Sequence, residues 1–90
     1  MTIYIDDIVN YPINSIKGKA KKFGNSWCHM WTDADTEELH EFAQQIGMKR
    51  SWFQNKPIFP HYDLVVSKRK LAIENGAKFM PLREWWQKKK

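Results

Sequence analysis

The stretch HYDLVVSKRKLAIENGA, residues 61–77, decides the fold of this 90-residue chain. Residues 64–66 are strand formers, and the following residues have helical composition. Ser67 is a suitable N-cap for that helix, and Gly76 is a suitable C-terminal stop. The pattern therefore predicts a short strand that runs directly into a helix, which is a building unit of α/β proteins.

The first turn of this predicted helix carries three cations, Lys68, Arg69 and Lys70. A helix N-terminus already bears about +0.5 charge, so cations are disfavoured there. At ~100° per residue, Lys68 and Arg69 share the half of the helix that holds residues 71–73, whereas Lys70 points away. With Ser67 and the free backbone N–H groups they predict an anion site. The alternative is that both cations extend over the core edge into water.

The composition indicates one small folded domain, residues 1–90, because 42% of the residues are hydrophobic and 14% are aromatic. A net charge of +5 favours a polyanionic or phosphate-bearing partner. Cys28 is the single cysteine, which excludes an intrachain disulfide and fits a reducing cytoplasm. No apolar run is long enough for a membrane span, so we expect a cytoplasmic protein without a membrane partner.

The remaining elements follow from periodicity and from capping residues. We predict strands over 2–5, 25–31, 48–54 and 77–80, and helices over 36–46 and 81–86. Residues 8–25 are expected to form a flexible connection, and residues 87–90 a frayed basic tail. The predicted class is α/β, with a single small sheet and two to three helices packed on it.

Several polar residues lie where chemistry is expected. Alternation in the strand 25–31 puts His29 on the same face as Trp27 and Trp31, either as a ligand-facing residue or as a buried, hydrogen-bonded histidine. Asp6 and Asp7 follow the first strand. Two carboxylates there can bind a metal or accept a hydrogen bond from a hydroxyl group, but most commonly they cap a turn. His40 is expected at the surface.

The expected ligand-binding residues are polar or aromatic side chains near the strand ends and the basic helix start. They are His29, Asp33, Arg50, Trp52, Gln54, His61, Tyr62, Asp63, Ser67, Lys68 and Arg69. Of these, His61, Asp63 and His29 are the catalytic candidates. No phosphate-binding loop, nucleophile elbow or zinc motif is found, so no metal and no cofactor is expected. A metal bound by His29, His61 and a carboxylate is the alternative.

The chain resembles a small bacterial and phage family, the domain of unknown function 4031. The segments that carry the resemblance are Tyr4-Ile5-Asp6-Asp7, Cys28-His29-Met30 with Asp33, Glu38-Leu39-His40 with Phe42-Ala43, Ile46-Gly47, Arg50-Ser51-Trp52-Phe53-Gln54, and His61-Tyr62-Asp63-Leu64 with Ser67-Lys68-Arg69, Ala72 and Gly76-Ala77. The resemblance implies a compact cytoplasmic protein of a bacterium or a phage-infected cell. It brings no established activity with it.

Three functions compete at this point. The leading hypothesis is a protein that binds a phosphorylated small molecule, a nucleotide above all, and sequesters a host nucleotide signal. The second is an enzyme that cleaves a phosphodiester or phosphoribosyl bond by histidine–aspartate acid–base chemistry. The third is a nucleic-acid-binding module that uses the basic connection and tail. Catalysis and binding without catalysis are both open alternatives, and each is compatible with a homo-oligomer.

Overall fold

The structure, a computed structural model, describes residues 2–10 and 26–88. Its strands are β1 (Ile3–Ile5), β2 (Val9–Asn10), β3 (Ser26–Thr32), β4 (Phe53–Gln54), β5 (His61–Val65) and β6 (Lys78–Phe79). Its helices are α1 (Thr36–Gln45), α2 (Val66–Glu74) and α3 (Leu82–Lys88), with a 3₁₀ turn at Arg50–Trp52. The predicted class is confirmed: the described residues form one six-stranded mixed sheet with three helices.

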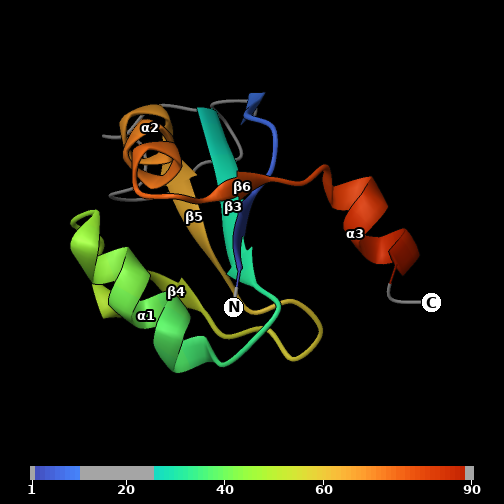
Figure 1. The fold of residues 1–90 in the computed structure, drawn as a ribbon, viewed down its shortest axis with the longest axis horizontal. Helices are drawn as coiled ribbons and strands as arrows, with labels where there is room; N and C mark the ends of the chain where they lie inside the picture. The colour runs from blue at the N-terminus through green and yellow to red at the C-terminus, as the bar shows by residue number, and fades with distance from the viewer. Residues whose placement is uncertain (1, 11–25, 89–90) are drawn as a thin grey trace.

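The sheet has the strand order β4-β5-β3-β1-β6, and β2 also pairs with β3. Only the β1–β6 pair is parallel among the described strands; the others are antiparallel. Figure 1 shows α1 and α2 on one side of the sheet and α3 on the opposite side. Most of the predicted connection 8–25 and the last residues of the tail lie outside the described residues. Val9–Asn10, within that connection, nevertheless forms β2.

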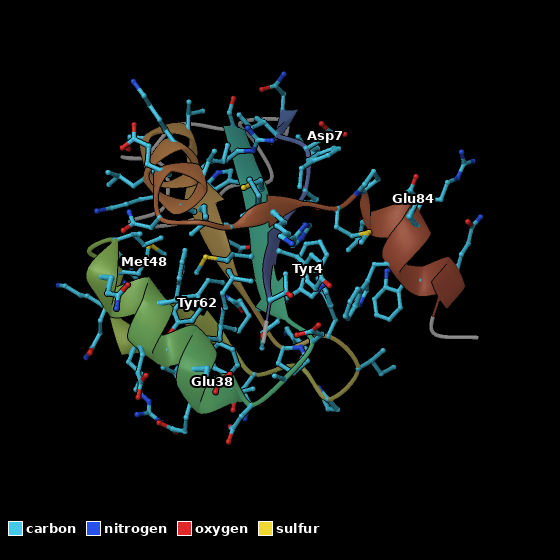
Figure 2. The ribbon with its side chains drawn as sticks, in the orientation of Figure 1. Tyr4, Asp7, Glu38, Met48, Tyr62 and Glu84 are labelled. Carbon is cyan, nitrogen blue, oxygen red and sulfur yellow. The ribbon has the colours of Figure 1, made fainter. Side chains whose placement is uncertain are left out.

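Alternation along the strands separates two faces of the sheet. The face toward α1 and α2 carries the core, to which the strands contribute Ile3, Ile5, Cys28, Met30, Tyr62 and Leu64. The other face, which we call the α3 face, carries Tyr4, Asp6, His29, Trp31, His61 and Asp63. Figure 2 shows Tyr4 on the side of α3 and Tyr62 on the side of α1. The predicted alternation of the strand 25–31 is therefore confirmed.

Helix α1 follows its sequence signals closely. Asp35 is the N-cap, and its side chain accepts a hydrogen bond from the backbone N–H of Glu37. Leu39, Ala43 and Ile46 bury one stripe of the helix. Gly47 ends it at a φ of 82°, a conformation that favours glycine.

The start and the inner face of α2 differ from the prediction. The helix begins at Val66 with Val65 as N-cap and no side-chain cap, so the expected Ser67 cap is wrong. Ala72 is fully buried, but Leu71 and Ile73 are 37% and 48% exposed, so residues 71–73 do not form the inner face. Ala72 instead shares its face with Lys68 and Arg69, four and three residues earlier. Both cations lean inward as predicted: they are half-buried, and their polar ends donate to Ile46 O and Asp6 O.

Two further expectations are wrong for tertiary reasons. The predicted strand 48–54 is reduced to β4, because the backbone N–H of Met48 bonds back to Ala43 O and a 3₁₀ turn follows. His40 is buried rather than at the surface. Its Nδ1 lies 2.7 Å from the hydroxyl of Tyr62, which satisfies a polar group inside the core.

We predict that Tyr62→Phe lowers the free energy of unfolding by ~1–3 kcal/mol, because it leaves the buried His40 nitrogen without a partner. Urea denaturation followed by tryptophan fluorescence measures this loss. Tyr4→Phe is the matched control: its hydroxyl makes one long, exposed contact of 3.4 Å to Asp33, so the change should stay within ~0.5 kcal/mol. Equal losses in both variants would contradict the role given to the Tyr62–His40 pair.

Candidate functional site

The α3 face brings two histidines and a carboxylate together. His29 on β3 and Asp63 on β5 are directly opposite each other in the antiparallel register. His61 lies two residues before Asp63 and so points to the same face. The ring centroids of His29 and His61 are 5.0 Å apart. Strand register thus places side chains that are more than 30 residues apart in the chain within contact distance.

The ring of His29 is fixed by Asp6. One carboxylate oxygen of Asp6 accepts the backbone N–H of His29, and the other lies 2.7 Å from His29 Nδ1. A carboxylate only accepts hydrogen bonds, so Nδ1 carries the proton. The Nε2 atom of His29 is therefore the one with a lone pair to offer.

The ring of His61 is fixed in the same sense by the backbone. His61 Nδ1 lies 2.7 Å from the carbonyl oxygen of Phe59, which only accepts, so Nδ1 is the donor. His61 Nε2 then faces Asp63 Oδ1 at 3.4 Å. Burial lowers the pKa of His61, but the hydrogen bonds with Asp63 and Phe59 and the charges of Asp63 and Asp6 outweigh burial and raise this pKa above its ordinary value.

The three side chains offer ligand atoms that all lie within 4.8 Å of one another. His29, His61 and Asp63 are the residues that could hold a metal ion in the described part of the chain. The side chains of His29 and His61 are 21% and 12% exposed, whereas that of Asp63 is 38% exposed. The cluster therefore opens to solvent on the side of Asp63. We call it the histidine–aspartate cluster.

Aromatic rings border the histidine–aspartate cluster. Phe59 stacks on His61 with ring centroids 4.9 Å apart and an interplanar angle of 25°. Phe59 also contacts Trp31 and, from α3, Trp86, each with a centroid distance of 5.3 Å. Phe59 and Trp86 are half-buried, so they present flat apolar surface beside the polar atoms.

Among the expected ligand residues that are cations, Arg69 contacts Asp6, which orients His29. Its Nε donates to the backbone carbonyl of Asp6 at 3.1 Å. Lys68 is engaged elsewhere, because its Nζ donates to Ile46 O at 2.9 Å and satisfies the end of α1. Arg50 pairs with Glu37 at 2.8 Å through exposed side chains.

The other predicted ligand residues divide between the two faces and the surface. Gln54 is opposite His61 in the β4–β5 register and so lies on the α3 face. Asp33 accepts the backbone N–H of Thr2 at 3.0 Å, four residues beyond His29 on the chain. Tyr62 lies in the core, Trp52 is exposed on the 3₁₀ turn and Ser67 is exposed in the first turn of α2.

Asp6 and Phe59 were not among the predicted site residues. The position of Asp6 favoured a turn cap, and this expectation is wrong. Its carboxylate instead orients His29. Alternation from Tyr4 already implies that Asp6 lies on the face of Tyr4, so this part of the signal was present in the sequence. The role of Phe59 depends on its backbone carbonyl and on the path of a loop, for which the sequence has no signature.

Fold and site together define a small mixed α/β domain with a histidine–carboxylate cluster on one sheet face. The family described as "Protein of unknown function (DUF4031)" matches residues 3–90, and the chain belongs to this family. The resemblance is thus confirmed. The chain matches no curated protein and no solved structure. In the described ranges, the helices are too short or too polar to cross a bilayer.

Cys28 lies behind His29, on the core face, and should be chemically inert in the folded protein. Burial and the Asp6 carboxylate raise the pKa of its thiol to about 12, although Arg69 opposes this shift. We predict that 5,5′-dithiobis(2-nitrobenzoic acid) at pH 8 reacts with Cys28 at least ~100-fold more slowly in the folded than in the urea-unfolded protein, since the thiolate is the nucleophile. Absorbance at 412 nm follows the reaction. Equally fast labelling in both states would show that Cys28 is accessible.

Proposed function

We propose that the chain binds a phosphorylated small molecule of the nucleotide class and hydrolyses its phosphoester bond at the histidine–aspartate cluster. The observation that carries this proposal is that His29, His61 and Asp63 bring three acceptor atoms together. Contacts with Asp6 and with Phe59 O fix the directions of the two histidine rings. Such a set holds and activates a water molecule, either directly or through a cation. The water oxygen bonds to phosphorus and gives its proton to the Asp63 carboxylate. The bond from phosphorus to the leaving oxygen breaks, and that oxygen takes a proton from solvent.

Two features support a nucleotide over other phosphate esters. Phe59 contacts both histidines of the cluster, and Trp86 contacts Phe59, so these half-buried rings provide apolar surface against which a base can stack. Arg69 adds positive charge at the edge of the site, where it donates to Asp6. A buried single thiol is compatible with the cytoplasm as the place of action, since no disulfide is needed.

Purified protein incubated with a panel of nucleoside mono-, di- and triphosphates, cyclic nucleotides and bis(p-nitrophenyl) phosphate should release product from at least one of them. The assays contain a mixture of divalent metal salts, and products are separated by ion-exchange chromatography. Asp63→Asn should lower the rate at least ~100-fold, because it removes the proton acceptor and an anionic ligand atom while keeping the shape.

Asp33→Asn is the matched control, since Asp33 is also an exposed carboxylate near β3 but lies outside the cluster. It should retain activity. Titration calorimetry with the same panel identifies the sequestering alternative, in which a nucleotide binds and no product forms. The enzymatic proposal fails if no compound is turned over or if both variants are equally active.

A further inference from the structure

The histidine–aspartate cluster presents ring nitrogens whose directions are fixed by neighbouring groups. With Nδ1 of both rings donating to Asp6 and to Phe59 O, the neutral histidines present unprotonated Nε2 atoms. His61 Nε2 and Asp63 Oδ1 are then two acceptors that face each other at 3.4 Å. Two lone pairs at this separation attract a positively charged partner, either a proton that His61 shares with Asp63 or a metal ion.

The nearby cationic side chains do not occupy this position. Arg69 directs its Nε to the backbone of Asp6, and Lys68 directs its Nζ to Ile46 O. The site meanwhile holds two carboxylates, of which Asp6 is almost fully buried. Two carboxylates beside neutral imidazole rings favour a bound cation at this position.

We propose that the protein binds one divalent first-row transition-metal ion through His29 Nε2, His61 Nε2 and the carboxylate of Asp63. Imidazole nitrogen selects such ions over Mg²⁺ and Ca²⁺, which prefer oxygen ligands. Three protein ligands leave a coordination position for water, as in catalytic zinc sites, whereas structural zinc sites use four.

The distances between the ligand atoms fit this assignment. Two donors that each lie ~2.0–2.1 Å from Zn²⁺ at a tetrahedral angle are roughly 3.3 Å apart. The observed separation of His61 Nε2 and Asp63 Oδ1 is 3.4 Å. The ligand atoms that the three residues offer all lie within 4.8 Å of one another.

The surroundings also match a metal site. Ligating histidines usually donate their other ring N–H to a carboxylate or to a backbone carbonyl, which fixes the tautomer and the ring direction. Asp6 does this for His29, and Phe59 O does it for His61. Asp6 is therefore a positioning residue. It acts on the metal only through His29.

The metal site rests on the proposed function and deepens it, because a metal ion would attract phosphate and make bound water more acidic. Metal binding is tested with the ion alone, so it can succeed even if no nucleotide is hydrolysed. If instead the EDTA-treated protein hydrolyses a nucleotide at full rate, the metal proposal falls and the proposed function stands.

The first experiment needs no variant. Tag-free, EDTA-treated protein is titrated with ZnCl₂ in a calorimeter, and long-range ¹H–¹⁵N NMR spectra are recorded with and without Zn²⁺. The chain has three histidines. We expect one equivalent of Zn²⁺ and large shifts of the Nε2 signals of His29 and His61, while the signals of the buried His40 stay unchanged. No binding, or equal perturbation of His40, would overturn the assignment.

The second experiment uses matched variants and Co²⁺, whose visible absorption reports its coordination. Asp63→Asn and His61→Gln should each weaken Zn²⁺ binding at least tenfold and alter the Co²⁺ spectrum. Asp6→Asn should weaken it ~10–100-fold, as expected for a residue that orients a ligand, and leave the Co²⁺ spectrum nearly intact. Asp33→Asn, the control, should bind like the original protein. Circular dichroism verifies that each variant is folded, and unchanged affinity in folded Asp63→Asn would refute the proposal.

Discussion

The buried residue Asp6 joins three elements of this structure through its carboxylate and its backbone. Its two oxygens accept the backbone and ring N–H groups of His29, its own N–H bonds to His29 O, and its carbonyl accepts Arg69. A carboxylate in this position is stable only because those donors replace water. The end of β1, the middle of β3 and the start of α2 are thereby fixed around one residue.

The two faces of the sheet differ in polarity. The face toward α1 and α2 is apolar and supplies the core, including Met30 and Leu64. The other face carries polar side chains that the core could not accommodate, with α3 covering one part through Trp85 and its contacts to Tyr4 and Trp31. The alternation of β3 and β5 makes the separation automatic, because adjacent residues point to opposite faces.

The histidines show how environment assigns different roles to one residue type. All three have Nδ1 in a hydrogen bond, to Asp6, Tyr62 or Phe59 O. His40 is enclosed by Phe53 and Tyr62, so its polarity is satisfied within the core. His29 and His61 lie on the face that opens at Asp63, so their remaining nitrogen atoms are the ones that can meet a ligand.

The α/β class, the capped helix α1 and the faces of β3 were predictable from residue order alone, because periodicity and caps are local signals. Tertiary structure decided the rest. Ala72 is the inner residue of α2, and the half-buried Lys68 and Arg69 share its face because their polar ends find partners at Ile46 O and Asp6 O, far away in the chain. The meeting of His29 with Asp63 was likewise set by the register between β3 and β5, since strand pairing is non-local and one residue of slip would turn either side chain to the other face.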